Sequence, residues 1–320
     1  MNKMKKIGLT ALAASLVSVS AQAADVSISG GAGLTYASGN DGVNGNPWSM
    51  TDNVTLSWGG ELDNGMTVDM SFLLDNSDGA ASQIFDNRSL AIGMGDAGTL
   101  TFWGQAGSGV VGSFDDRTPN AYEESWNSAD SPNQGHSASN MFYYTNSFDG
   151  ATVHASFAHG GSSDASIDSS TEFGVVIDAI DNLELYAALG TDKGNLTATA
   201  DVDNTIIGAK FTMGAATLGV QVNEADSATA NSDEEFTAWS ISYAVSEDMS
   251  VSFAQSEINY EASTTASQEA TGISASYTMG SMTLAGTMNS IDNQNLTGAT
   301  GSGNQDANTD TFEVNLSFAF

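Results

Sequence analysis

The sequence contains no cysteine. A chain without cysteine forms no disulfide and carries no thiol nucleophile, which excludes disulfide-stapled folds and thiol catalysis. Proline is almost as scarce, with 3 residues among 320. Because proline cannot donate a backbone hydrogen bond, its scarcity leaves nearly the whole chain free to enter β-ladders.

Basic residues are also few. The chain has 7 Lys and Arg against 39 Asp and Glu, a formal net charge of −32. Such a charge repels nucleic acid and anionic lipid and attracts small cations, although part of it can serve solubility alone. The apolar residues are spread along the chain rather than gathered into runs of about 20, which argues against membrane-spanning helices.

The amino terminus has the pattern of an export signal. Lys3, Lys5 and Lys6 precede an apolar segment, Ile7–Val19, that is too short to cross a bilayer. Ala21 and Ala23 then form a small-residue cleavage site, so residues 1–23 are predicted to be a cleaved signal peptide. The remaining chain, 24–320, is predicted to be one domain, and it keeps only 4 basic residues against the 39 acids.

The last ten residues, Thr311–Phe320, alternate between apolar and polar side chains. Successive side chains of a β-strand point to opposite faces, so this segment predicts a strand with one apolar and one polar face. The apolar face would carry Phe312, Val314, Leu316, Phe318 and Phe320; the polar face would carry Glu313, Asn315, Ser317 and Ala319.

The same alternation recurs along the chain and predicts sixteen strands. Their predicted ranges are 25–38, 54–62, 67–75, 88–94, 99–105, 140–148, 152–159, 172–179, 183–191, 205–213, 216–224, 236–245, 249–260, 271–279, 282–291 and 311–320. Aromatic residues on the apolar parity would suit the membrane interfaces: Trp58, Phe211, Trp239, Tyr243, Tyr277, Phe318 and Phe320.

The connections between these strands alternate between tight turns and long polar loops. The turns recur about every 33 residues, except across one long interval that contains residues 106–139, hereafter the long loop. Short turns on one rim and long loops on the other are typical of an outer-membrane barrel. Lipid offers the backbone no hydrogen bonds, so a sheet that crosses it must close, and sixteen strands enclose an aqueous lumen. The predicted fold class is therefore an all-β, sixteen-stranded antiparallel transmembrane barrel.

Several segments of the chain resemble the Gram-negative general porins, especially the sixteen-stranded trimeric porins of alphaproteobacteria. The resemblance rests on Val26–Gly30, Leu56–Met66, Gly93–Leu100, the long loop and the terminal Phe320. It implies a homotrimer of water-filled channels in the outer membrane, each narrowed by a third loop that folds inward. It also implies that Phe320 is the signal read by the outer-membrane assembly machinery.

The long loop is the candidate constriction of such a channel. Phe114, Tyr122 and Trp126 are predicted to anchor it on the inner wall, which leaves its acids to face water. Rings of carboxylates select cations by lowering the local potential. The predicted constriction acids are Asp115, Asp116, Glu123, Glu124 and Asp130, and the lumen parity adds Asp69, Glu172, Asp178, Glu184 and Glu313.

Few basic residues are available to line the predicted pore. Arg88, Arg117 and Lys210 are the candidate wall and loop cations. General porins usually oppose loop acids to an arginine cluster, so this chain departs from the family pattern. We expect a more uniformly negative pore that prefers cations, and passive diffusion of small hydrophilic solutes and ions.

The sequence is also compatible with other interpretations. The three histidines do not combine with a serine in a recognisable catalytic arrangement, so the chain is expected not to be an enzyme. No cofactor is expected, although acidic stretches such as Asp75–Gly79 or Asp115–Asp116 would suit Ca²⁺. A substrate-specific porin and a secreted acidic β-rich adhesin are the alternatives.

Overall fold

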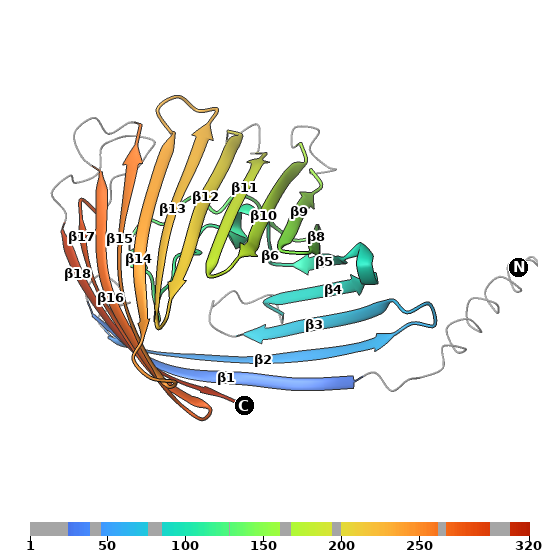
Figure 1. Ribbon diagram of the computed structural model, residues 1–320, viewed down its shortest axis with the longest axis horizontal. Coiled ribbons are helices and arrows are strands. Elements are labelled where there is room, and N and C mark those ends of the chain that lie inside the picture. The colour runs from blue at the N-terminus through green and yellow to red at the C-terminus, as the bar shows by residue number, and fades with distance from the viewer. Residues whose placement is uncertain are drawn as a thin grey trace, which may run out of the picture.

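The computed structural model describes residues 25–38, 46–75, 85–127, 129–160, 168–193, 200–261, 267–294 and 308–320. In these ranges the chain forms a closed antiparallel barrel of sixteen strands, as predicted (Figure 1). The predicted signal peptide lies outside the described residues. No helix in the described ranges is long and apolar enough to cross a membrane.

Most barrel strands pair with their neighbours in sequence. Going around the barrel, the strands are β1 (Asp25–Ser38), β2 (Trp48–Glu61), β3 (Thr67–Asp75), β4 (Asn87–Gly93), β5 (Thr99–Gln105), β8 (Met141–Phe148), β9 (Ala151–Ala158), β10 (Ser170–Ile180), β11 (Leu183–Asp192), β12 (Val202–Met213), β13 (Ala216–Ser227), β14 (Glu234–Ala244), β15 (Met249–Tyr260), β16 (Gln268–Met279), β17 (Met282–Asp292) and β18 (Thr309–Ala319).

The barrel closes between its first and last strands. β1 and β18 pair from Gly31 opposite Ala319 to Ser38 opposite Phe312. Beyond this ladder, the Gly30 amide donates to the Phe320 carbonyl at 2.7 Å and the Phe320 amide donates to the Gly30 carbonyl at 3.0 Å. Closure removes the two exposed strand edges that an open sheet would leave in lipid.

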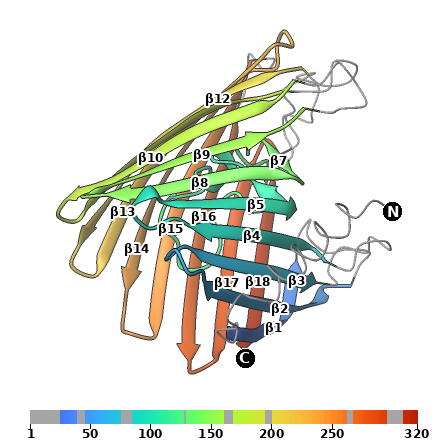
Figure 2. The ribbon, with the colours of Figure 1, turned by 90° about the vertical axis from the view of Figure 1, so that its right-hand side faces the viewer.

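The outer surface is apolar, as the alternation predicted. Residues directly opposite one another in an antiparallel pair share a face, and the outward parity carries large exposed apolar side chains on all the barrel strands except β3, β4 and β5. Six of the aromatic residues predicted for the interfaces are exposed on this face: Phe211, Trp239, Tyr243, Tyr277, Phe318 and Phe320. Figure 2 shows the strands running obliquely, with the tight turns gathered along one rim.

Two of those tight turns depend on glycine. Gly214 and Gly280 have φ of +63° in the two-residue connections that follow β12 and β16. A positive φ at this position matches the twist of a two-residue hairpin, and glycine adopts it without steric strain.

One strand begins earlier than the sequence predicted. β2 starts at Trp48 rather than at residue 54, within a segment that was expected to be loop. Trp48 pairs with Tyr36, and the two rings meet edge to face with centroids 5.0 Å apart. Asp52 hides this extension in the sequence, because it places a carboxylate on the outward, otherwise apolar parity.

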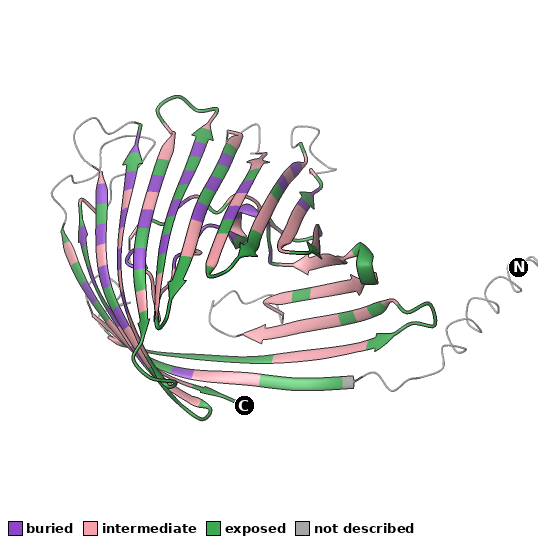
Figure 3. Ribbon diagram, in the orientation of Figure 1, coloured by how far each residue is buried: buried purple, intermediate pink, exposed green. Residues whose placement is uncertain are grey.

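Most of the buried strand residues lie on one part of the inner wall. Figure 3 shows buried bands across β9–β17, whereas β2, β3, β4 and β5 contain no buried residue. The long loop covers the inner face of β9–β17. The inner wall therefore has a covered part, β9–β17, and a bare part, β2–β5.

Candidate functional site

The long loop leaves the wall and returns to it at one place. Its two legs pair as the short strands β6 (Gly107–Ser108) and β7 (Ser137–Ala138). The Gly109 amide also donates to the His136 carbonyl at 2.9 Å. A 3-10 turn, η3 (Val111–Ser113), follows on the outgoing leg. The two legs of the loop are therefore held together where the loop begins and ends.

The first apolar anchor of the loop is Phe114, as predicted. Its side chain is fully buried, together with Val110 and Val111. These three side chains pack on Tyr186 and Ala188 of β11 and on Ile206 of β12. Burying a phenylalanine contributes roughly 1.5–3 kcal/mol, so this cluster alone holds the outgoing leg against the wall.

The second apolar anchor is Trp126, also as predicted. Its ring meets that of Phe236 on β14 edge to face, with centroids 5.0 Å apart. Ile258 and Tyr260 of β15 complete this cluster. Phe114 and Trp126 thus fix the loop at two separated points, so that it follows the curve of the wall.

Between the two anchors, small polar side chains of the wall hold the loop backbone. Ser240 donates to the Pro119 carbonyl at 2.7 Å, and the Ala121 amide donates to Ser252 at 2.9 Å. The Tyr122 amide donates to Ser274 at 3.2 Å and the Arg117 amide to Gln221 at 3.1 Å. From sequence, these serines indicated only a wetted lumen. Their alternation was visible, but nothing in it showed that a loop would cover them.

Tyr122 extends the contacts to the last strand. Its hydroxyl donates to Glu313 of β18 at 2.5 Å, so Glu313 faces the lumen as predicted. Burial raises the pKa of the Tyr122 phenol, and the hydrogen bond to Glu313 raises it further, because both favour the neutral phenol.

The constriction acids do not all face water as predicted. Asp116 and Asp130 are exposed, and Glu123 and Glu124 are half-buried. Asp115 is a correction, since its side chain is only 4% exposed. Its backbone carbonyl accepts hydrogen bonds from Gln221 and Asn223 of β13, which draws the residue against the wall.

Two of these carboxyl groups are poised to titrate near neutrality. Burial, together with the negative charge of Asp116, raises the pKa of Asp115 to about 7. Burial, together with the negative charges of Glu124 and Glu313, also raises the pKa of Glu123 to about 7. Both causes disfavour the ionised form, so these groups carry only partial charge at pH 7.

Arg117 and Lys210 lie in the lumen and share one carboxylate. The Arg117 guanidinium is 3.0 Å and the Lys210 ammonium 2.9 Å from the same oxygen of Glu184. The guanidinium also lies over the rings of Phe114 and Tyr186, with centroids 4.9 and 5.2 Å away. Both predicted cations are therefore held on the covered part of the wall.

Arg88 does not line the pore, and its assignment as a wall cation is corrected. It lies directly opposite Phe72, and Leu90 lies opposite Met70 on the same ladder. This is the outward face, and Arg88 is exposed there beside Gly104. The sequence placed Arg88 at the start of a strand but did not settle its parity.

The lumen acids fall into two groups. Asp69 is exposed on the bare part of the wall, and Asp178 is exposed beside Glu184 in a cavity of about 730 Å³. Glu172 is a correction, because it is completely buried beneath the long loop and does not face the aqueous path. In the described residues, no three His, Asp or Glu side chains converge as they would around a metal ion. Most of Asp75–Gly79 lies outside the described residues, so calcium binding stays a prediction.

Comparison with known proteins identifies the family. The profile described as Gram-negative porin matches residues 8–263, which is most of the chain. This chain belongs to the Gram-negative porin family. It is accordingly a multi-pass protein of the outer membrane, and the interpretation as a secreted adhesin is wrong. Among curated protein sequences, none matches the chain at a significant level.

Solved outer-membrane proteins, porins among them, share the fold of this porin at low sequence identity. The anion-selective porin of Comamonas acidovorans is 15% identical, with a TM-score of 0.70 over 93% of this chain and 100% of that one. A loop-L8 deletion mutant of OmpT, an outer membrane protein of Vibrio cholerae, is 14% identical, with a TM-score of 0.71 over 93% and 100%. A mutant porin of Rh. blastica is 16% identical, with a TM-score of 0.65 over 92% and 100%.

Proposed function

We propose that this porin is a cation-preferring channel for passive diffusion of small hydrophilic solutes and ions. One observation carries the cation preference: among the described residues, no Lys or Arg side chain faces the lumen without a carboxylate partner. Outside the predicted signal peptide the chain has four basic residues, all of them described. Arg117 and Lys210 contact Glu184, Lys193 contacts Asp201 at 2.7 Å, and Arg88 faces outward.

Carboxylates on the aqueous path are not balanced in this way. Asp116 and Asp178 line the cavity below the loop, and Asp69 lies on the bare part of the wall. A low-dielectric wall focuses the field of such charges into the lumen, which raises the local concentration of cations. The Comamonas acidovorans porin shares the barrel and is anion-selective, so a cation preference of this porin would have to come from the charges on its inner wall and not from the barrel itself.

The test is the zero-current potential of the purified porin in a planar bilayer under a KCl gradient. We expect the sign that corresponds to K⁺ preference, with a magnitude that falls as salt screens the wall charges. A potential of the opposite sign would overturn the proposal. Sugar uptake into porin-containing liposomes measures the passage of neutral solutes, and exclusion of all small sugars would contradict general diffusion.

We also propose that this porin is a homotrimer. One of the OmpT structures from Vibrio cholerae is described as a trimer form, at 12% identity. In this chain, Asp52 of β2 and Arg88 of β4 place charges on the outward face. A charge that faces lipid destabilises a barrel, by roughly 2–4 kcal/mol for Arg at the bilayer midplane, and a contact between subunits would shield it. A heat-labile band of trimer mass on a gel is expected, and a monomer in mild detergent by light scattering would refute it.

A further inference from the structure

Glu172 is the acid of the inner wall that cannot act on permeating ions directly. It lies on β10 with its side chain 0% exposed, enclosed by the two legs of the long loop. A buried carboxylate is unfavourable unless its oxygens accept hydrogen bonds that replace water. The partners of Glu172 therefore indicate what it does.

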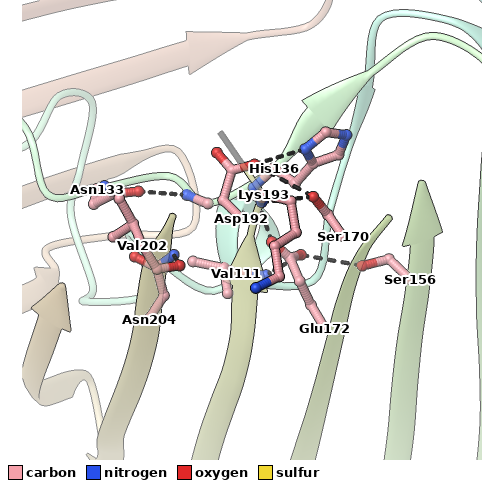
Figure 4. A network of polar contacts seen from close by, with 11 residues as sticks. Val111, Asn133, His136, Ser156, Ser170, Glu172, Asp192, Lys193, Val202 and Asn204 are labelled. Carbon is pink, nitrogen blue, oxygen red and sulfur yellow. Dashed lines mark hydrogen bonds and ion pairs between the residues drawn. The ribbon is translucent and has the colours of Figure 1, made fainter. Parts of the chain in front are cut away.

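Three donors from three segments converge on this carboxylate. The Val111 amide donates at 3.0 Å from the outgoing leg, and the His136 amide donates at 2.8 Å from the returning leg. The Ser156 hydroxyl donates at 3.0 Å from β9. Figure 4 shows these groups around Glu172. A single side chain thus ties both ends of the loop to the wall.

Glycines on three sides make room for the carboxylate. Gly109 and Gly135 belong to the two legs of the loop, and Gly190 lies opposite Glu172 on β11. A Cβ atom at any of the three would meet Glu172 closer than van der Waals contact allows. The close approach of both legs to Glu172 therefore depends on this set of residues together.

The returning leg has a second polar contact beside this niche. The His136 ring is 2.9 Å from Asp192, at the end of β11. Ser170 accepts a hydrogen bond from the Lys193 amide at 2.9 Å and also contacts Asp192. These contacts hold the His136 side chain, whereas Glu172 holds the His136 backbone and the outgoing leg at once.

We propose that Glu172 is the positioning residue of the constriction: it fastens both legs of the long loop to the barrel wall and so fixes where the loop acids sit in the pore. It acts on permeation through the loop and not through its own charge. This inference rests on the proposed channel function. An ionised carboxylate suits the role because it only accepts hydrogen bonds, and three donors face it.

The first experiment compares Glu172→Gln with Asp178→Asn, a neighbouring inward acid on the same strand. Both variants remove one formal negative charge. Glutamine places an NH₂ group against a backbone N–H donor, so one leg of the loop loses its partner. We expect Glu172→Gln to give noisy single-channel currents with a broadened conductance distribution. Asp178→Asn should give steady currents with only a shifted zero-current potential.

The second experiment measures loop release without any current. The chain has no cysteine, so Val111→Cys introduces one thiol at a fully buried position of the outgoing leg. A small, water-soluble methanethiosulfonate reagent should modify this thiol slowly in the single variant Val111→Cys and in the double variant Val111→Cys/Asp178→Asn. In Val111→Cys/Glu172→Gln the rate should rise about ten-fold or more, because losing a hydrogen bond to a charged group shifts an equilibrium that far.

Steady currents and a protected thiol in the Glu172→Gln background would overturn the proposal, as would equal noise in Asp178→Asn. If Glu172→Gln fails to assemble, Ser156→Ala removes one partner of the carboxylate and should raise the modification rate moderately; an unchanged rate would overturn the proposal. A parent porin that forms no ion-conducting pore would refute the channel function instead, and thiol protection would still test Glu172.

Discussion

The covered and bare parts of the inner wall are built from the same strand pattern but have different surroundings. On β9–β17 the inward side chains meet the long loop, and many of them are buried. On β2–β5 no inward side chain is buried, and the loop is met there at its base, where Asn87 donates to the Ala106 carbonyl at 3.1 Å and Trp103 lies against Gly107. A polar inward side chain therefore either holds the loop or faces the solutes, depending on which part of the wall carries it.

Serine shows the difference most simply. Ser252 and Ser274 on the covered part are buried and accept hydrogen bonds from the loop backbone. Ser57 and Ser89 on the bare part line an open cavity of about 280 Å³. The loop divides the pore wall into a supporting side and a permeating side, and the following variants test that division.

The largest effect should come from removing both apolar anchors. In the double variant Phe114→Ala/Trp126→Ala, each substitution removes roughly 3–5 kcal/mol of the packing free energy that holds the loop on the wall. The loop should then leave the covered part of the wall, with an unstable and altered single-channel conductance. Leu73→Ala, an inward residue of bare strand β3, is the matched control and should leave the conductance steady. Equal behaviour of the two variants in planar bilayers would contradict the division of the wall.

A smaller effect is expected from removing one negative charge, and its size should depend on which part of the wall loses the charge. Glu184→Gln and Asp69→Asn both remove one negative charge. Glu184→Gln also leaves Arg117 and Lys210 without their shared carboxylate beside the loop. The zero-current potential should therefore shift further toward anions in Glu184→Gln than in Asp69→Asn. Shifts of the same size would show that position relative to the loop does not matter.

The pH dependence should follow the loop acids. Asp115 and Glu123 have pKa values raised to about 7, so both lose charge as the pH falls from 8 to 6, and cation preference should weaken across that range. The raised values also mean that the docked loop binds protons more tightly than the released loop. Docking should therefore strengthen as the pH falls through 7 and weaken as it rises.

The double variant Asp115→Asn/Glu123→Gln is the control for this titration. It lacks both groups, so its zero-current potential should stay nearly flat between pH 8 and 6. If the zero-current potential of this variant changed between pH 8 and 6 as much as that of the unaltered porin, other acids of the pore would be responsible for the titration.

The smallest effect is expected outside the lumen. Arg88→Gln should leave the zero-current potential unchanged, because Arg88 faces away from the pore. Lys210→Gln removes the same charge from the covered part of the wall and should increase cation preference. If Arg88→Gln produced a shift as large as that of Lys210→Gln, the outward placement of Arg88 would be wrong.

The sequence predicted the barrel well because strand patterning is local. Each strand shows its two faces in its own residues, as Thr311–Phe320 does, and β1, β5 and β15 begin and end where predicted. The prediction was wrong at the start of β2, where Asp52 breaks the apolar parity. The long loop and its anchors Phe114 and Trp126 were also predictable, because a break in the turn spacing and bulky side chains are features of one segment.

The roles of individual polar residues were not predictable in the same way. Asp115 was expected to face water and is buried, Glu172 was expected to act on ions and holds the loop, and Arg88 was expected in the pore and lies outside. In each case the sequence gives the residue type, and at best its parity.

The sequence by itself determined a two-faced strand pattern, a lack of cations and one oversized loop, because these depend on neighbouring residues alone. The tertiary structure decided which inward groups reach the solutes, which ones the loop covers and which carboxylate meets which donor. Segments as distant along the chain as Tyr122 and Glu313 become partners only once the barrel has closed. Burial and hydrogen bonding then set the charge that each group presents to the pore.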